Sequence, residues 1–366
     1  SFNPISVTAP EKSFINARET APCGGMAEVK FLIDSVVADA MGQVVPEMTV
    51  GDLKGGANHI HIAGPREDGG TYIHYEWPAG GTGASVGVDG SNAVRSYNEG
   101  DFNSIQSVET VESQYPLRVE RCEIRTGACG DGANRGGFGL RRELRVLDET
   151  AMLSVLSEKN VIPPYGVAGG SNGAANRFVV ERDGKVIQPS DVPGKVSGFA
   201  LSTGDIVREE TAGGGGFGDP LTRDPALVAD DVELEYLTVD QAEARYGVVF
   251  AAGGAVDAAA TAAKREALAG ARETVTLEIA NEDDIDGPRR RIAVPSTLAN
   301  NLGISDGDLV ELRGKAVAPL RGWARVTKAT DSLLSIGPAG MRLLNADPGD
   351  GIEIRAVHAA PEGVLS

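Results

Sequence analysis

Glycine is the feature of this sequence that most limits how the chain can fold. It accounts for 48 of the 366 residues, whereas an average protein is about 7% glycine. The glycines gather in short loops such as residues 80–84 and 213–218 rather than in one low-complexity tract. Neither loop has the Lys-Ser or Lys-Thr ending of a phosphate-binding P-loop, and neither clearly opens a βαβ unit. We therefore expect tight turns and close approaches between backbones rather than a nucleotide site.

The composition excludes disorder and a nucleic-acid partner. Hydrophobic residues make up 41% of the chain and charged residues 23%, and no stretch approaches the ~18 apolar residues of a spanning helix. The net charge of −18 would repel a phosphate backbone. The cysteines, Cys23, Cys122 and Cys129, include no CxxC pair, which favours a reducing compartment, and we expect a cytoplasmic protein.

A β-rich region makes up most of the first predicted unit, which we place at residues 1–218. Apolar alternation over residues 5–9 predicts a first strand, and helical spacing over residues 27–41 predicts a helix whose apolar stripe packs on a core. From residue 57 to residue 207, short β-like runs alternate with clusters of glycine, asparagine and aspartate. The expected fold class is therefore α+β and β-rich, with mixed or antiparallel sheets and helices.

A helical segment is predicted at residues 219–270. Asp224 precedes a proline, so it offers an N-cap with proline at the first helical position. Thr238 and Gln241 have the spacing of a capping box. An alanine-rich helix is expected over residues 251–269.

An internal repeat fills the third predicted unit, residues 275–366. Residues 292–312 align with residues 334–354 at a fixed offset of 42, and Glu311 falls on Glu353. Each copy reads as strand, short helix, Gly-Asp turn and strand, so two similar units could close around a pseudo-twofold axis. The pattern resembles a double-psi β-barrel, and the alternative is two unrelated strand-helix-strand units.

Three of the four histidines lie close together in the sequence, at His59, His61 and His74. His59 and His61 would project from one face of a strand, and His74 and Glu76 would repeat that geometry on a second strand. Side by side, the two strands could offer three imidazoles and a carboxylate to a divalent metal. The alternative is a set of hydrogen-bonded polar histidines near a loop. Because spacing alone cannot bring the strands together, we assign no metal ligands to this chain.

Several segments, taken in order, resemble the hydantoinase B family, and the resemblance covers about residues 1–268. This family includes the B component of N-methylhydantoinase, half of 5-oxoprolinase, caprolactamase, and the alpha subunits of acetone and acetophenone carboxylases. The segments that carry the resemblance are residues 7–16, 80–84, 115–121, 135–140, 213–225 and 246–248.

The resemblance implies an ATP-dependent enzyme built from two kinds of subunit. A hydantoinase A-like partner, which binds ATP and Mg²⁺, would phosphorylate the oxygen of a lactam, imide or enol, and the B-type subunit would complete hydrolysis or carboxylation. Phosphorylation makes an unreactive amide carbonyl electrophilic, and a metal-bound hydroxide could then attack it at neutral pH. We therefore expect a subunit of an ATP-dependent amidohydrolase that acts on a cyclic amide or imide.

The chain also departs from the family pattern. The family's metal motifs lie in its N-terminal half, so the resemblance implies the C-terminal part of a B-type subunit, with Zn²⁺ or Mn²⁺ on a companion N-terminal chain. The start at Ser1 would then reflect cleavage, processing or a split gene. His59 and His61 stand where many relatives are rich in asparagine, which points to an altered substrate pocket. The repeated unit lies beyond the usual end of the family, and assembly or partner docking is its expected role.

The candidate site residues follow from their chemistry and their position near the glycine loops. His74 or Glu76 could move protons or polarise the substrate, and Asn103 could hydrogen-bond the substrate carbonyl. The candidate catalytic residues are His74, Glu76, Asn103 and Glu109. The candidate substrate contacts are His59, His61, Gly81 and Gly83.

Two other functions fit the same sequence. A ketone carboxylase subunit would share the machinery but direct an activated enol at CO₂, and assays with and without bicarbonate would separate it from a hydrolase. A non-catalytic scaffold subunit would fit the absence of a complete triad, a Walker loop and a convincing metal cluster.

Overall fold

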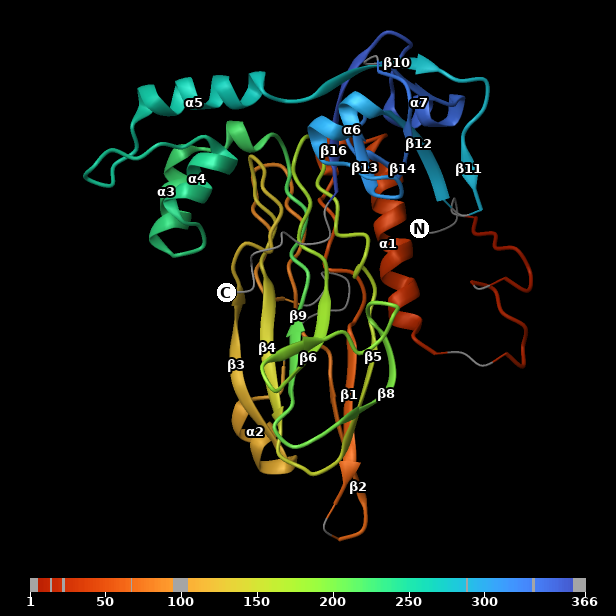
Figure 1. Ribbon diagram of the computed structural model, residues 1–366, viewed down its shortest axis with the longest axis vertical. Coiled ribbons are helices and arrows are strands. Elements are labelled where there is room, and N and C mark those ends of the chain that lie inside the picture. The colour runs from red at the N-terminus through yellow and green to blue at the C-terminus, as the bar shows by residue number, and fades with distance from the viewer. Residues whose placement is uncertain are drawn as a thin grey trace.

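The computed structural model of the protein describes residues 6–13, 15–21, 24–66, 68–94, 105–287, 289–330 and 333–357. Along the long axis, a β-sandwich is followed by a layer of glycine-rich segments and by an end that carries helices and the C-terminal barrel (Figure 1). The predicted α+β, β-rich class is confirmed. The strand expected at residues 5–9 is not formed by residues 6–9. None of the helices in the described part has the length and apolar character of a membrane span.

Two antiparallel sheets form the sandwich, because each has one apolar face to bury. Ile60 and Leu153 of one sheet lie in the same buried cluster as Leu144 and Val207 of the other. The first sheet has the order β2–β1–β5–β8, with β1 at His59–Pro65, β2 at Thr71–Glu76, β5 at Ala151–Leu156 and β8 at Lys195–Leu201. The second has the order β3–β4–β9–β6–β7, with β3 at Leu117–Arg125, β4 at Gly139–Val146, β6 at Arg177–Arg182, β7 at Lys185–Ile187 and β9 at Ile206–Glu210. The short helix α2 (Val108–Gln114) precedes β3.

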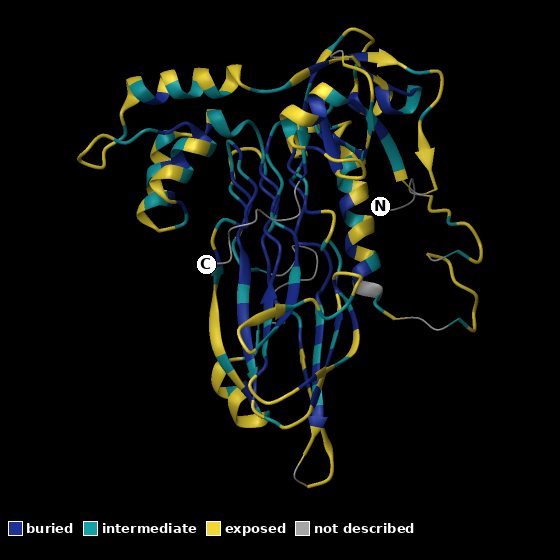
Figure 2. Ribbon diagram, in the orientation of Figure 1, coloured by how far each residue is buried: buried dark blue, intermediate teal, exposed yellow. Residues whose placement is uncertain are grey.

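Next to the sandwich, glycine-rich segments lie against one another and are joined backbone to backbone. We call them the glycine layer, which comprises residues 51–54, 80–90, 128–138, 163–173 and 212–218. The N–H of Gly137 donates to the carbonyl of Thr82 (2.8 Å), and the N–H of Gly214 donates to Gly137 (2.9 Å). The N–H of Gly130 in turn donates to Gly214 (2.8 Å). These segments are largely buried although they belong to no helix or strand (Figure 2). Because buried backbone groups need hydrogen-bond partners, the segments stabilise one another.

Glycine is required in this layer because the backbones lie too close together for a side chain. A Cβ atom at Gly81 would overlap the carbonyl oxygen of Gly137, and a Cβ atom at Gly83 would overlap that of Gly51. Neither Gly81 nor Gly83 has a left-handed φ, so space rather than backbone conformation selects glycine at these positions. The predicted close approach between backbones is confirmed.

Helix α1 (Met26–Gly42) forms where the sequence predicts it, but the prediction that its apolar stripe packs on the chain's own core is wrong. Phe31 is buried together with the polar residues Glu28 and Ser35, whereas Val36 and Val37 are exposed. The reason is that buried polar contacts, described below, fix the inner face of the helix. The 3₁₀ helix η1 (Pro46–Met48) follows α1.

Three helices, α3, α4 and α5, follow the glycine layer and the 3₁₀ helix η2 (Pro220–Thr222). The predicted caps are confirmed: Asp224 accepts from the N–H of Ala226 (2.9 Å), and Thr238 and Gln241 form a capping box. The last helix begins later than the predicted residue 251, because Phe250 and Val256 form a bridge across a turn. The bounds are Pro225–Glu233 for α3, Val239–Tyr246 for α4 and Ala258–Gly270 for α5.

Buried ion pairs join these helices to the glycine layer. The guanidinium of Arg223 donates to both oxygens of Asp89 (2.8 Å each) and to Asp231 of α3 (2.9 Å). The Nε of Arg135, from the glycine layer, reaches the other oxygen of Asp231 at 3.0 Å. The buried charges of Arg223, Arg135 and Asp231 are retained because each has a partner of opposite sign.

The C-terminal strands form an interlocked barrel. β12 pairs in parallel with β14, β10 pairs in parallel with β15, and β13 and β16 form a central antiparallel pair. Contact between β12 and β15 closes the sheet. The first repeat copy, β12 and β13, pairs with β14, and the second copy, β15 and β16, pairs with β10 in the equivalent way. The two copies meet at β13 and β16, which confirms the predicted pseudo-twofold arrangement. The bounds are Thr274–Ile279 (β10), Ile285–Asp286 (β11), Arg289–Pro295 (β12), Ser296–Leu302 (α6), Leu309–Arg313 (β13), Leu320–Thr327 (β14), Leu333–Ile336 (β15), Pro338–Leu344 (α7) and Gly351–Ala356 (β16).

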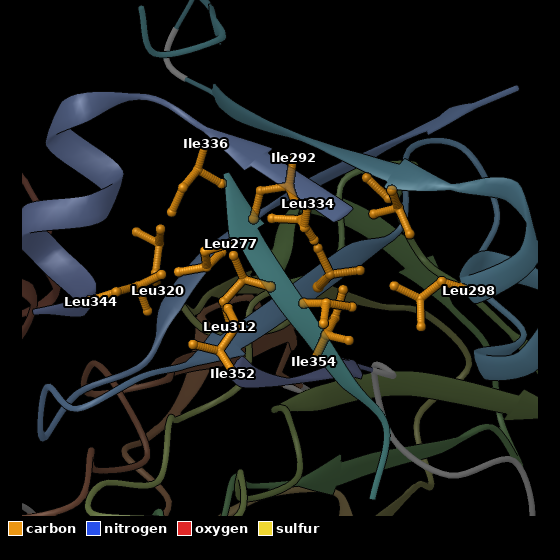
Figure 3. Packing of buried hydrophobic residues seen from close by; sticks show 14 of the residues in the cluster. Leu277, Ile292, Leu298, Leu312, Leu320, Leu334, Ile336, Leu344, Ile352 and Ile354 are labelled. Carbon is orange, nitrogen blue, oxygen red and sulfur yellow. The ribbon is translucent and has the colours of Figure 1, made fainter. Parts of the chain in front are cut away.

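Apolar side chains from both repeat copies fill the barrel. Leu312 and Ile354, which are equivalent in the repeat, lie in one core with Leu277 and Leu334 (Figure 3). The exact boundaries predicted for the three units stay a prediction, although each unit contains a buried apolar cluster.

A buried carboxylate ties the barrel to the glycine layer. Glu311 accepts from the Nε of Arg321 (2.9 Å) and also pairs with Arg355. These two guanidinium groups also donate to the glycine layer, to the carbonyl of Pro163 (2.7 Å) from Arg321 and to the carbonyl of Gly170 (3.1 Å) from Arg355. Burial alone would raise the pKa of Glu311, but Arg355 and Arg321 outweigh it, so the pKa lies below its usual value.

The Gly83→Ala variant tests backbone packing in the glycine layer. It is expected to destabilise the protein by at least about 3 kcal/mol or to prevent folding, because the new methyl group would overlap a backbone atom that cannot move away. Gly253→Ala is the matched control, since no atom lies within 4 Å of that Cβ position, and it should stay within about 1 kcal/mol of wild type. Urea unfolding monitored by circular dichroism measures both, and equal stability of the two variants would contradict the packing argument.

The Glu311→Gln variant tests the anchor of the barrel. Removing this charge leaves two arginines without their carboxylate, and a cost of about 3 to 5 kcal/mol is expected at pH 7. Because the folded-state pKa of Glu311 is lowered, this contribution should disappear as the pH falls through that pKa. Glu243→Gln, which breaks an exposed pair with Lys264, should cost under about 1 kcal/mol. Equal urea midpoints for the two variants at pH 7 would refute the anchor.

Candidate functional site

The structure places the four predicted histidine and glutamate residues on two neighbouring strands but on opposite faces. β1 and β2 are antiparallel, with Ile62 opposite His74 and His61 opposite Tyr75. His59 and His61 therefore lie on the outer face of the sheet, whereas His74 and Glu76 point into the sandwich. The three imidazoles and the carboxylate do not meet, because side chains alternate along each strand.

His74 and Glu76 belong to a buried cluster with two residues that the sequence analysis missed, Arg142 and Glu209. The Oε2 atom of Glu76 lies 3.4 Å from Nε2 of His74 and 3.2 Å from Nε of Arg142. The N–H of Gln106 donates to the other oxygen of Glu76 at 3.1 Å. All four side chains of the cluster are almost fully buried, so in this arrangement they do not contact a substrate.

The carboxyl group of Glu209 is fully buried in this cluster. Burial, followed by repulsion from Glu76, raises the pKa of Glu209 well above its usual value, and Arg142 offsets only part of that rise. Among the described residues, neither carboxyl oxygen of Glu209 has a hydrogen-bond partner. The cluster thus holds an ion pair between Arg142 and Glu76 beside the carboxyl group of Glu209, and all of these groups are buried inside the sandwich.

The outer face of the sheet carries a second cluster that is open to solvent at Tyr75. The hydroxyl of Tyr75 lies 2.6 Å from Nδ1 of His59, and Nε1 of Trp77 donates to the same hydroxyl. The ring of His61 stacks on the ring of Tyr75, with centroids 4.3 Å apart and planes 10° apart. Burial, with a smaller contribution from His74, lowers the pKa of His61, so this ring is neutral near pH 7.

Glu28 reaches this cluster from helix α1 and completes a line of proton carriers. Its Oε1 atom lies 3.5 Å from Nε2 of His59 and accepts from the N–H of Asn58 at 3.2 Å. When the imidazole of His59 carries its proton on Nδ1, it donates to the hydroxyl of Tyr75, and its Nε2 atom can accept a proton from Glu28. We call Glu28, His59 and Tyr75 the outer-face relay.

The pKa of Glu28 suits proton transfer near neutral pH. Burial raises it to about 7, although the positive charge of Lys54 and the N–H of Asn58 act in the opposite direction. Glu158 raises the pKa slightly and Lys195 lowers it. A carboxyl group with a pKa close to the working pH can both accept and return a proton.

The remaining predicted site residues lie elsewhere. Gly81 and Gly83 lie inside the glycine layer, where close packing accounts for them. Glu109 is exposed on the first turn of α2, where Ser107 is the N-cap. Asn103 lies outside the described residues. Their predicted roles stay predictions.

Two members of the relay, Glu28 and Tyr75, were missed by the sequence analysis for different reasons. Glu28 is distant in sequence and reaches His59 only because α1 turns its polar face inward. Tyr75 lies between the two predicted residues His74 and Glu76, and the alternation of the strand places it on the other face. Its partnership with His61 depends on the register between β1 and β2.

Metal-ligating side chains are not gathered into a cluster in the described part of the chain. No group of three or more histidine, cysteine, aspartate or glutamate side chains in that part is placed to hold a metal ion. This agrees with the separation of His59 and His61 from His74 and Glu76 by the sheet itself.

Comparisons with known proteins point to one family. The profile described as hydantoinase B/oxoprolinase matches residues 1–220. The beta subunit of the caprolactamase of Pseudomonas jessenii is 32% identical over 272 residues, which cover 70% of this chain and 45% of that protein. The B component of a putative D-/L-hydantoinase from a Pseudomonas strain is 28% identical over 251 residues, which cover 68% of this chain and 41% of that protein.

A solved structure of a caprolactamase is also similar to this chain. The crystal structure of the ATP-dependent caprolactamase from Pseudomonas jessenii is similar over 71% of this chain and 46% of that chain, with a TM-score of 0.56 and 26% identity. The chain therefore spans less than half the length of these relatives.

The Glu28→Gln variant tests the raised pKa. Because the folded-state pKa of about 7 exceeds the ordinary value of 4.5, folding takes up a proton between these values, and the stability that this group contributes is lost as the pH rises through 7. A shift of this size corresponds to about 3 kcal/mol. Glutamine cannot ionise, so the loss of unfolding free energy between pH 4.5 and pH 8 should be about 3 kcal/mol smaller in the variant. Identical pH dependence in urea titrations would contradict the assignment.

Proposed function

Because the chain belongs to the hydantoinase B/oxoprolinase family, we propose that it is part of an ATP-dependent amidohydrolase that opens a cyclic amide or imide. Relatives named as components of a caprolactamase and of a D-/L-hydantoinase support this substrate class. The observation that carries the proposal is the outer-face relay, which lies within the residues that match the family. Opening a cyclic amide needs proton carriers, because the ring nitrogen must gain a proton as its bond to carbon breaks.

The energy for ring opening would come from a partner subunit. An A-type subunit with ATP and Mg²⁺ would transfer a phosphoryl group to the amide oxygen, which makes the amide carbon electrophilic. Water then adds to that carbon, and the C–N bond breaks with its electron pair on nitrogen, which leaves an acyl phosphate. A second water hydrolyses the acyl phosphate to a carboxylate and inorganic phosphate. The divalent metal implied by the family belongs, in this proposal, to the rest of the B-type polypeptide, and none of the roles proposed for this chain depends on it.

The outer-face relay would supply the proton for the leaving nitrogen. Tyr75 is the member of the relay that is most exposed, so its hydroxyl would donate to the ring nitrogen. His59, 2.6 Å away, would return a proton to the phenolate, and Glu28 would return one to the imidazole. The stacked ring of His61 holds the phenol in place and forms a flat wall against which a planar amide can lie.

Turnover by the native complex tests the proposed function. The complex, purified from the source organism with its ATP-binding subunit, is expected to open at least one of hydantoin, 5-oxoproline and caprolactam, with one ADP formed per ring opened. Mass spectrometry of the product and an ADP assay measure this. Substrate consumption only in the presence of bicarbonate would instead indicate a carboxylase. ADP formation and ring opening that stay at background with every substrate would refute the proposal.

The Tyr75→Phe variant tests the relay within that complex. Loss of the hydroxyl is expected to lower kcat at least about 100-fold while KM changes little, because the proton donor acts in the transition state. Glu123→Gln, at an exposed position of β3, is the control and should retain the wild-type kcat. A Tyr75→Phe complex with wild-type kcat would exclude the relay even if ring opening itself is observed.

A further inference from the structure

Helix α1 presents its apolar side chains to solvent instead of to the chain that carries it. Among the side chains of α1 that the structure describes, Phe31 is the one large apolar side chain that is buried, and the buried side chains of Glu28 and Ser35 are polar. Figure 2 shows an exposed stripe along the outer side of the helix. The exposed apolar residues are Leu32 (38%), Ile33 (48%), Val36 (68%), Val37 (54%) and Met41 (52%).

Buried polar contacts keep the helix in this orientation. The hydroxyl of Ser35 donates to Asp52 (2.9 Å), which also pairs with the ammonium of Lys159. The hydroxyl of Tyr165 donates to the backbone carbonyl of Ser35 (3.2 Å). Turning the helix to bury Val36 would expose this network and separate Ser35 from its partners, so the outward apolar face is built into the fold.

The start of α1 lies against the outer face of the four-stranded sheet, which also carries exposed apolar side chains. Leu156 of β5 lies against the start of α1, next to Gly25, and it is opposite His59 in the register of β1 and β5. Met152 and Ile73 lie on the same face on either side of Ala63, and both are more than half exposed. We call the exposed apolar residues of α1 together with Leu156, Met152 and Ile73 the outer apolar surface.

We propose that the outer apolar surface docks the part of a B-type polypeptide that lies outside these 366 residues. The chain matches less than half the length of its relatives, so those proteins carry a further portion of comparable size. A surface of at least eight exposed apolar side chains in one region is typical of an interface rather than of a free face. This inference rests on the family membership stated above.

Docking at this surface would bring the missing part to the outer-face relay. Leu156 and His59 are paired across the sheet, and Tyr75 is next to His59. A polypeptide that covers α1 and β5 would therefore form one wall of a pocket whose other wall carries Tyr75. Such a pocket explains how one substrate could contact this relay and a group held by the other part.

Hydroxyl-radical footprinting of the native protein tests this surface. After correction for intrinsic reactivity, Val36 and Met41 are expected to be labelled at least tenfold more slowly than Leu234 and Val186. These two controls are exposed on other elements. The comparison works whether the missing part is continuous with these residues or a separate chain. Labelling of Val36 and Met41 at the rate of the controls would overturn the proposal.

The mass of the labelled particle is measured in parallel. If Val36 and Met41 are protected in a particle whose mass equals two copies of this chain alone, a second copy covers the surface and the proposal is also overturned.

The Val36→Asp variant, made in the source organism, provides the second measurement. A charge at the centre of an apolar interface is expected to weaken docking at least tenfold, which is about 1.4 kcal/mol. Labelling of Met41 should then rise towards the control rate, and Leu234→Asp is the matched substitution that should leave Met41 protected. If Met41 stays protected in Val36→Asp, the surface is not the docking site. Ring-opening activity is assayed separately, so protection of the surface with no ring opening in wild type would contradict only the proposed function.

Discussion

The contact on which the rest of this structure depends is the close approach of backbones in the glycine layer. Segments that are far apart in sequence, around Gly81, Gly137 and Gly214, satisfy one another's hydrogen bonds without forming a sheet. A methyl group at many of these positions would overlap a backbone atom. The layer is therefore stiff, and the sandwich, helix α1, the helical segment and the barrel are all attached to it.

Buried arginine–carboxylate pairs attach the helical segment and the barrel to the glycine layer, although acidic residues outnumber basic ones in this chain, whose net charge is −18. Arg223 and Arg135 fix the helical segment through Asp231. Glu311 fixes the barrel by holding two arginines that reach carbonyl groups of the layer. In each case an arginine spans the junction, because a planar guanidinium can bind a carboxylate and a backbone carbonyl at once.

Sequence reasoning succeeded where neighbouring residues decide the structure. The capping box at Thr238 and Gln241 and the repeat that carries Glu311 and Glu353 were both readable without a fold. It failed for α1, because an apolar stripe shows which face of a helix is apolar but does not show whether that face packs on the same chain. The site was half predicted, since alternation relates His59 to His61, whereas the link from His59 to Tyr75 and Glu28 depends on register and on the orientation of α1.

The central claim is that substrate meets this chain at the outer-face relay. Photo-crosslinking of the native complex tests it most directly, with a cyclic amide that carries a diazirine, with ATP present, and with the labelled peptides identified by mass spectrometry. The account predicts that label falls on residues 59–61 or 75–77 and that an excess of unlabelled cyclic amide removes it. Label that falls only on the buried His74 and Glu76 cluster, or only on the barrel, would contradict it.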